Sequence, residues 1–216
     1  MMRFGFLLIA FFAASAQASF DYAAWSNTNK DGSWTKAAEY AVSKSPLPRQ
    51  IPRDIYYFCP TYAKLNQKER KKFWVGLLSA MAKPESNFRP QSYYTEKFTD
   101  AKGRRVVSRG LLQISIESAN QQRYNCDIPT ATLLHDPKVN LSCGVKILSK
   151  WVQSDGVIAK AQYAKKVPMP RANQQTSKPS THFGGSRYWS TLREQHGHLP
   201  KIAEFTRTLP FCHQKT

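Results

Sequence analysis

Glu85 has the surroundings in this sequence that best suit acid–base chemistry. It stands in the run Ala82-Lys83-Pro84-Glu85-Ser86-Asn87-Phe88, directly after an apolar helical pattern and beside an aromatic residue. Desolvation by such neighbours raises the pKa of a carboxyl group and keeps it protonated near neutral pH. A protonated carboxyl group of this kind can act as a general acid on a glycosidic oxygen. Taken alone, the Glu-Ser pair equally fits a surface glutamate at the end of a helix.

A second motif follows 25 residues later (110 − 85 = 25) and supports the first. Gly110-Leu111-Leu112-Gln113-Ile114 begins with a glycine, which lets a ligand approach the backbone closely. We expect Gln113 to bind an N-acetyl group or a hydroxyl of a sugar, the alternative being a polar residue that faces water at a helix start. Glu117-Ser118 repeats the Glu-Ser pair after this motif, within an expected helix, and we interpret it as structural.

The order of these motifs resembles the soluble lytic transglycosylases, a family within the lysozyme-like superfamily. Glu85-Ser86 and Gly110–Ile114 are similar to its Glu-Ser and Gly-Leu-Met-Gln-Ile motifs, and residues 140–148 resemble its Asn-x3-Gly-x-x-x-Leu helix. The resemblance covers most of residues 70–150. It implies a mainly α, lysozyme-like single globular domain, and the polar and aromatic residues 89–109 predict a small irregular or hairpin excursion beside the cleft.

The resemblance also implies an activity, namely cleavage of the β-1,4 bond between N-acetylmuramic acid and N-acetylglucosamine in peptidoglycan. In a lytic transglycosylase, Glu85 would act first as acid and then as base, and the 6-hydroxyl of the sugar would attack to leave a 1,6-anhydro end. A true lysozyme admits water and usually has a second carboxylate, for which Glu96 and Asp100 are candidates. A third alternative is a non-catalytic basic module that binds the cell wall.

Further residues are candidates for binding the glycan. The resemblance implies that Ser86 is a substrate-side or orienting hydroxyl. Tyr93, Tyr94 and Tyr188 could stack on sugar rings, although each could equally belong to the core. The Ala-Tyr-Asn motif of the family has its counterpart around residues 181–185, where His182 takes the place of the tyrosine.

The cysteines and histidines indicate disulfides rather than a metal site. Four cysteines without CxxC spacing predict two disulfides, and of three possible pairings we favour Cys126–Cys143 and Cys59–Cys212. The His-x-His pair at 196–198 lacks the ligand spacing of a metal site, so we expect neither a metal nor another cofactor.

The first residues predict an export signal. A charged start is followed by an apolar stretch at 4–14 and by the small-x-small pattern Ala16-Gln17-Ala18. We therefore expect residues 1–18 to be a signal peptide, with a membrane anchor as the alternative, and the protein to be periplasmic or secreted after cleavage near Ala18. The remainder divides into an N-terminal extension at 19–50 and the lysozyme-like domain at 51–216.

The net charge of +18 and the pI of about 9.9 predict polyanionic partners. We expect peptidoglycan glycan strands and the anionic surface of the cell wall to be those partners, and we expect no nucleic acid because only charge supports it. Nothing predicts assembly beyond a monomer. A basic, proline-containing stretch at about 165–187 predicts a long flexible loop.

The main helices follow from apolar periodicity. Patterns at 31–42, 114–122, 139–152 and 188–196 predict helices, and Asn66 with Glu69 predicts a capping box that begins a helix extending to about Ala82. Pro84 disfavours helical geometry at the preceding residue, so we expect this helix to end or kink just before Glu85.

Overall fold

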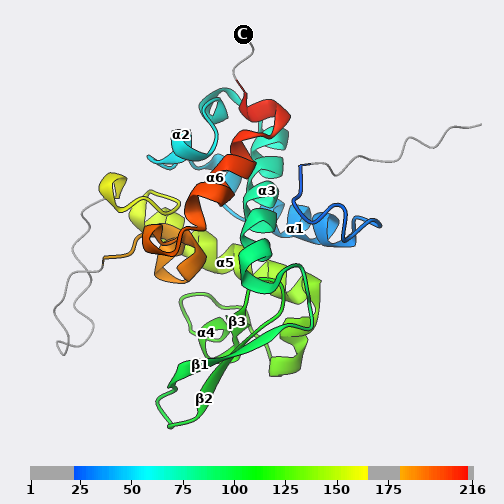
Figure 1. Ribbon diagram of the computed structural model, residues 1–216, viewed down its shortest axis with the longest axis vertical. Coiled ribbons are helices and arrows are strands. Elements are labelled where there is room, and N and C mark those ends of the chain that lie inside the picture. Colours follow the sequence, from blue (N-terminus) through cyan, green and yellow to red (C-terminus); the bar gives the residue numbers. More distant parts are fainter. Residues whose placement is uncertain (1–21, 165–180, 214–216) are drawn as a thin grey trace, which may run out of the picture.

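The structure, a computed structural model, describes residues 22–164 and 181–213. It is mainly helical and carries one small sheet at one end (Figure 1). The α-helices are α1 (Ser33–Lys44), α2 (Ile55–Phe58), α3 (Gln67–Ser86), α4 (Ile116–Ala119), α5 (Pro137–Asp155) and α6 (Leu199–Arg207). The strands are β1 (Tyr93–Thr99), β2 (Arg105–Arg109) and β3 (Ile114–Ser115). This arrangement confirms the mainly α class and the hairpin excursion that the sequence predicts.

Helix α3 is the central element, and it runs through the middle of the molecule toward the sheet (Figure 1). Every residue from Phe73 to Ala82 is buried in the core. The predicted capping box is present, because Asn66 accepts hydrogen bonds from the backbone of Glu69 and the Glu69 carboxylate accepts one from the Asn66 backbone. A long buried helix with a defined start gives its last turn a fixed position, and Glu85 lies in that turn.

The local preference of the sequence predicts that helix α3 ends or kinks just before Glu85. The helix does not end there. It continues to Ser86 and ends at Asn87, which takes the left-handed conformation with φ 51°. The buried Ser86 hydroxyl donates hydrogen bonds to the Ala82 carbonyl, at 3.2 Å, and to the Leu111 carbonyl, at 2.9 Å. These contacts hold the last turn helical, so tertiary packing overrides the preference of the residue before a proline.

Helix α5 packs against α1 and forms the second layer of the body. The Asp136 carboxylate caps its first turn by accepting from the Lys138 backbone at 2.7 Å, and Gly156 ends it in the left-handed conformation with φ 69°. Gly144 lies on its inner face, where a Cβ atom would collide with the Leu112 side chain. The close approach of α5 to residues 110–114 therefore depends on that glycine.

The sheet is antiparallel in the order β1-β2-β3. Tyr93 pairs with Arg109, Thr99 pairs with Arg105, and Ser108 pairs with Ser115. The helix predicted over 114–122 is therefore mostly wrong: its first two residues form β3, and only α4 is helical. Ile114 and Ser115 pair with β2, so they are extended and the helix starts only after them.

The helix predicted over 188–196 is also wrong. The segment instead forms short 3-10 helices, and the last α-helix is α6. The 3-10 helices around the site are η5 (Gly184–Arg187), η6 (Ser190–Leu192) and η7 (Glu194–His196). Side-chain hydrogen bonds to distant elements hold this segment. Trp189 Nε1, for example, donates to the Leu112 carbonyl at 2.8 Å. Such long-range contacts compete with the formation of a regular helix.

Two disulfides tie the chain together, in the pairings that the sequence favours. Cys59–Cys212 joins residues 153 apart and fastens the C-terminal segment to the end of α2. Cys126–Cys143 joins residues 17 apart and fastens the loop after α4 to α5. Each closes a loop whose entropy would otherwise favour the unfolded chain.

The described part of the predicted N-terminal extension belongs to the globular body. Trp25 is fully buried and donates a hydrogen bond to Thr35 at 2.9 Å, and Val42 of α1 is also fully buried. Residues 22–50 therefore share one hydrophobic core with α3 and α5. Among the described residues, no helix is both long and apolar enough to cross a membrane.

The expected signal peptide at 1–18 lies outside the described residues. So does most of the expected basic loop, at 165–180. The rest of that loop is described, and residues 184–187 form the buried 3-10 helix η5 rather than a loose segment.

Candidate active site

Glu85 lies on the last turn of α3 at the edge of a cleft of about 480 Å³. Its Oε1 atom accepts a hydrogen bond of 2.6 Å from the hydroxyl of Thr191 in η6. Burial raises the pKa of Glu85 from 4.5 to about 7; the Thr191 hydrogen bond and the positive charge of Arg193 oppose this rise, while the negative charge of Glu96 adds to it. Glu85 is therefore protonated in a large fraction of molecules at neutral pH.

The backbone turns sharply after Glu85 and directs the chain into the hairpin. Asn87 and Phe88 both have positive φ, 51° and 59°, so the helix ends abruptly beyond the carboxyl group. Ser86 is buried and does not line the cleft, and its hydroxyl joins the end of α3 to the backbone of Leu111. The Ser86 hydroxyl thus links the two motifs from within the core.

Residues 110–114 form a tight turn that Asn140 of α5 supports. Gly110 has φ 77°, and a Cβ atom there would collide with the Leu134 carbonyl and with the side chain of Asn140. The Asn140 amide donates to the carbonyls of Arg109 and Leu134, each at 2.9 Å, and accepts from the Leu112 backbone at 2.9 Å. The asparagine and the glycine of the two motifs therefore meet in space.

Gln113 lines the cleft in a left-handed conformation with φ 46°. Its Nε2 atom donates to the Gly110 carbonyl at 2.8 Å and to the Ser92 carbonyl at 3.3 Å. The backbone uses the donor group of this amide, which leaves the side-chain oxygen as the part suited to accept from a ligand.

Glu96 is the one residue of β1 that is not exposed, and it lines the same cleft as Glu85. The hydroxyl of Ser108, on the neighbouring strand β2, donates to Glu96 Oε1 at 2.7 Å. The structure thus brings the two predicted carboxyl groups into one cleft, on opposite elements. Asp100 instead lies at the tip of the hairpin, where its carboxylate accepts from the backbone and side chain of Arg104.

Aromatic side chains form the wall of the cleft beyond Glu85. Tyr188, Trp189, Tyr124 and Trp151 line it, and Phe98 adds an exposed ring from the hairpin. Burial raises the pKa of Tyr188, and its hydroxyl bonds to residues 115 and 118 of the β3–α4 segment. Such flat apolar surfaces suit sugar rings.

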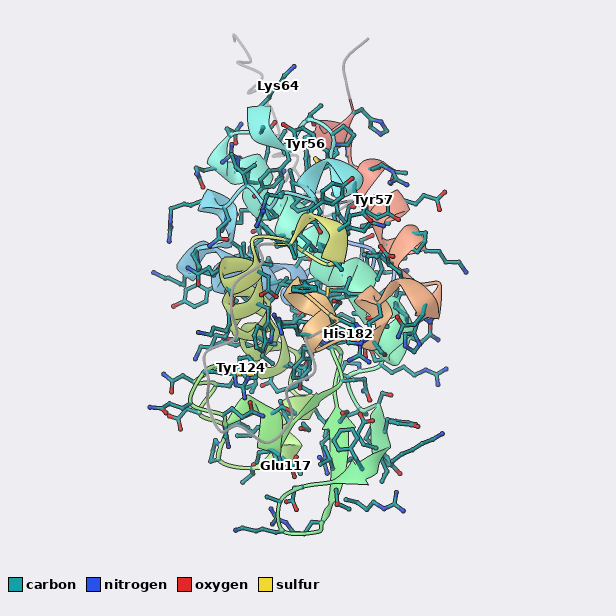
Figure 2. The ribbon with its side chains drawn as sticks, turned by 90° about the vertical axis from the view of Figure 1, so that its left-hand side faces the viewer. Tyr56, Tyr57, Lys64, Glu117, Tyr124 and His182 are labelled. Atoms are coloured by element: carbon teal, nitrogen blue, oxygen red, sulfur yellow. A yellow bond between two sulfur atoms is a disulfide. The ribbon has the colours of Figure 1, made fainter. Side chains whose placement is uncertain are left out.

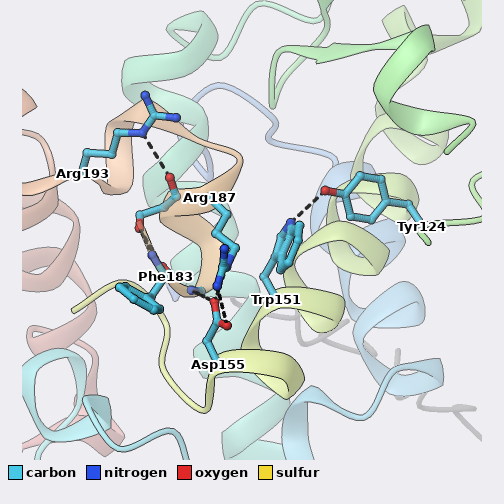
Figure 3. Close-up of polar contacts among 8 residues, drawn as sticks. Tyr124, Trp151, Asp155, Phe183, Arg187 and Arg193 are labelled. Carbon is cyan, nitrogen blue, oxygen red and sulfur yellow. Dashed lines mark hydrogen bonds and ion pairs between the residues drawn. The ribbon is translucent and has the colours of Figure 1, made fainter. Parts of the chain in front are cut away.

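Positive charge surrounds these rings. The Arg187 guanidinium lies over the rings of Trp151 and Phe183, at 4.9 and 5.2 Å, and forms a buried ion pair with Asp155 at 2.6 Å (Figure 3). Asp155 also accepts from the Gly184 backbone at 2.7 Å. Asp155 therefore anchors the segment that carries Tyr188 and Thr191 to the end of α5.

Four of the predicted binding residues do not line the cleft, and the buried Ser86 is one of them. Tyr93 and Tyr94 are exposed on β1, at 69% and 53%, and His182 lies outside the lining beside Arg193 and Arg187. Tyr188 lines the cleft that holds Glu85, whereas His182, at the counterpart of the family tyrosine, does not. Burial lowers the pKa of His182, and the positive charges of Arg193 and Arg187 lower it further.

The sequence reasoning missed several cleft residues. They are Phe98, Tyr124, Trp151, Arg187 and Arg193; it also missed Thr191, which is not part of the lining but donates a hydrogen bond to Glu85. Most of these reach the cleft from segments far from Glu85 in sequence, with Thr191 separated from it by 106 residues. The aromatic pair Tyr188-Trp189, which follows Gly184-Gly185, is the signal in the sequence that marks this wall of the cleft. Among residues 22–164 and 181–213, no group of three or more histidine, cysteine, aspartate or glutamate side chains is arranged to hold a metal ion.

The family model "Transglycosylase SLT domain" matches residues 63–164, which span α3, the sheet and α5. The wild-type form 2 of Bd0314 DslA is a solved structure with 39% identity to this chain and a TM-score of 0.75, covering 88% of this chain and 97% of its own. One glutamate-to-glutamine mutant of Bd0314 DslA is 38% identical to this chain with a TM-score of 0.74, covering 89% of this chain and 98% of its own. A second glutamate-to-glutamine mutant is 39% identical with a TM-score of 0.75, covering 88% of this chain and 97% of its own.

The chain belongs to the SLT transglycosylase family. No curated protein matches it. Membership of this family establishes lysozyme-like peptidoglycan cleavage of the lytic transglycosylase type. The residues that match the family model include Glu85, the turn at 110–114 and Asn140.

Proposed function

We propose that this protein cleaves the β-1,4 bond between N-acetylmuramic acid and N-acetylglucosamine as a lytic transglycosylase, with Glu85 as the general acid and base. The observation that carries the proposal is the environment of Glu85: a partly buried carboxyl group with a pKa of about 7, held by Thr191 at the edge of a cleft with aromatic walls. A group with this pKa both gives and takes a proton near neutral pH.

In the proposed mechanism Glu85 acts twice. It first donates its proton to the glycosidic oxygen, the bond from that oxygen to the muramic carbon breaks, and positive charge develops on the sugar ring. The Glu85 carboxylate then takes the proton of the 6-hydroxyl of the same muramic sugar. The hydroxyl oxygen bonds to the positive carbon, which leaves a 1,6-anhydro end and returns Glu85 to its acid form.

Hydrolysis is a second candidate, and the position of Glu96 favours it. Glu96 lines the same cleft, its orientation is set by Ser108, and its charge raises the pKa of Glu85. The two glutamates mutated in the Bd0314 DslA structures are 11 residues apart, as are Glu85 and Glu96 (96 − 85 = 11). A second carboxylate at this place could activate a water molecule or stabilise the charged sugar ring.

Mass spectrometry of the fragments released from purified peptidoglycan tests both candidates. A transglycosylase releases fragments with 1,6-anhydro ends, whereas a hydrolase releases reducing ends that carry one added water. Glu85→Gln should reduce the rate by at least about a hundredfold in either case. Glu117→Gln is the matched control, because it changes the other Glu-Ser pair outside the cleft lining. An active Glu85→Gln protein would overturn the assignment of Glu85, and Glu96→Gln would then show which carboxylate is required.

We further propose that the protein acts after export, at the cell wall. The two disulfides support an oxidising compartment. The signal peptide at 1–18 and the choice between periplasm and secretion stay predictions from the sequence.

A further inference from the structure

A second groove shares a wall with the catalytic cleft. It has a volume of about 370 Å³ and lies between the end of α1 and the outer face of α5, and we refer to it as the α1–α5 groove. Arg123 and Tyr124 line both this groove and the cleft. The Arg123 guanidinium lies 5.7 Å from the ring centres of Tyr124 and Trp151, so this stack forms the boundary between the two. A ligand that extends from the cleft over this boundary enters the α1–α5 groove.

The α1–α5 groove is lined by cations without a balancing acid. Lys44, Arg123, Lys146 and Lys150 line it, and no carboxylate does. None of these four side chains forms an ion pair within the part of the chain that the structure describes. The catalytic cleft differs, because it contains Glu85 and Glu96. The charge of the groove therefore favours an anionic ligand.

The shape of the groove is fixed by covalent and polar contacts. The disulfide Cys126–Cys143 fastens the loop that carries Arg123 to α5, and Lys146 Nζ donates to the Asn125 carbonyl at 2.6 Å. Ser149 in the groove lining has a buried hydroxyl oxygen without a hydrogen-bond partner among the described residues. A buried hydroxyl of this kind is a site where a ligand or water can complete a hydrogen bond.

We propose that the α1–α5 groove binds the carboxylate-bearing stem peptide of a glycan strand whose sugars occupy the catalytic cleft. This inference rests on the proposed function, because it takes that strand to be the substrate. Muramic sugars carry short peptides with free carboxylates, which match the four cations. The volume suits a few residues rather than a long polymer, and Ala41, Pro46 and Val145 offer apolar surface to alanine methyl groups.

Binding to the inactive Glu85→Gln protein tests this assignment without any need for turnover. Two glycan oligosaccharides of equal length, one with tetrapeptides and one without, are titrated by calorimetry. We expect the peptide-bearing form to bind about tenfold more tightly. Adding Lys44→Gln and Lys150→Gln should remove that difference while leaving affinity for the peptide-free form unchanged, because both lysines are exposed and line only the α1–α5 groove.

A matched control removes the same charge elsewhere. Lys64 and Lys68 are exposed near the start of α3, and Lys64 lies at the end of the molecule opposite Glu117 (Figure 2). Lys64→Gln with Lys68→Gln should keep the tenfold difference. Amidation of the peptide carboxylates gives a test that needs no groove variant, and it should weaken binding to the unmodified groove by a similar factor.

Three results would overturn the proposal: equal affinity for the two oligosaccharides, equal effects of the two lysine pairs, or no effect of amidation. Failure of the proposed function gives a different result. In that case the wild-type protein releases no fragments from peptidoglycan, whereas the affinities measured with the Glu85→Gln protein still report on the groove.

Discussion

The protonation of Glu85 controls the pH range in which this site can act as an acid. Burial raises its pKa to about 7, and the Thr191 hydroxyl lowers it by donating to the charged form. The rate of glycan cleavage, as kcat/KM, should therefore fall as pH rises through about 7. Thr191→Val removes that donor, so the pKa should rise and the fall should move to higher pH. The pH profile of kcat/KM on soluble glycan strands measures both.

The control for Thr191 is Thr208, whose hydroxyl donates to the Phe205 carbonyl of its own helix. Thr208→Val should leave the profile of the wild-type protein unchanged. A Thr191→Val profile that stays in place or moves to lower pH would contradict a direct contact of Thr191 with the ionising carboxyl group.

The same pKa shift predicts a cost in stability. The folded protein holds the Glu85 proton up to a pH of about 7, whereas the unfolded chain releases it near 4.5. The free energy of unfolding therefore falls as pH rises from 4.5 to 7. Above pH 7 it stays lower by the full free energy needed to bury the charged carboxylate. Glu85→Gln should stabilise the protein by about 2 kcal/mol at pH 8, reduced from the full shift because the side chain is partly exposed.

Urea unfolding at pH 4 and at pH 8 measures this difference. At pH 4 the carboxyl group is mostly protonated in both states, so the variant and the wild-type protein should have nearly equal free energies of unfolding. A stabilisation of the same size at both pH values would show that the gain comes from packing rather than from the charge.

At the scale of elements, the ion pair of Asp155 with Arg187 links the end of α5 to the segment 184–192. The Asp155 side chain is 1% exposed and accepts from both Arg187 and the Gly184 backbone. Asp155→Asn leaves a buried guanidinium without its counter-charge, which should cost about 3–5 kcal/mol of unfolding free energy. Because this segment carries Thr191 and Tyr188, kcat/KM should fall under conditions where the variant is still folded.

An exposed ion pair provides the comparison for Asp155. Asp100 pairs with Arg104 at the hairpin tip, where the Arg104 side chain is 65% exposed. Asp100→Asn should change the unfolding free energy far less than Asp155→Asn does. Equal effects of the two substitutions would contradict an anchoring role for Asp155.

The elements differ in how far the sequence predicts them, for physical reasons. Helices α1, α3 and α5 follow from apolar periodicity and from capping residues such as Asn66, because these signals are local. The two wrong helices, over 114–122 and 188–196, lie where long-range contacts decide the backbone, as in the bond from Trp189 to Leu112. Thr191 could not be predicted at the site, because only tertiary packing brings it to Glu85 across 106 residues.

At the scale of the whole molecule, the chain has a large excess of positive charge, whereas the cleft holds two carboxyl groups, those of Glu85 and Glu96. Lysines and arginines number 32 against 14 acidic residues. Such a field acts over about 10 Å at 0.1 M salt and draws the protein to an anionic surface before any bond is cleaved. Under the proposed function, we expect the charge to affect how the protein finds the wall, and Glu85 and its neighbours to affect the chemical step.

This separation predicts a difference in salt dependence between two substrates. On whole cell walls, activity should fall by about tenfold or more between low and high salt, because screening weakens attachment to the anionic surface. On a short, soluble glycan oligosaccharide, activity should change little, because we expect the cleft to bind it through aromatic rings and hydrogen bonds that salt screens weakly. Initial rates on both substrates across a salt series measure this. An equal loss on both would mean that salt acts on the cleft itself, and attachment through surface charge would then be excluded.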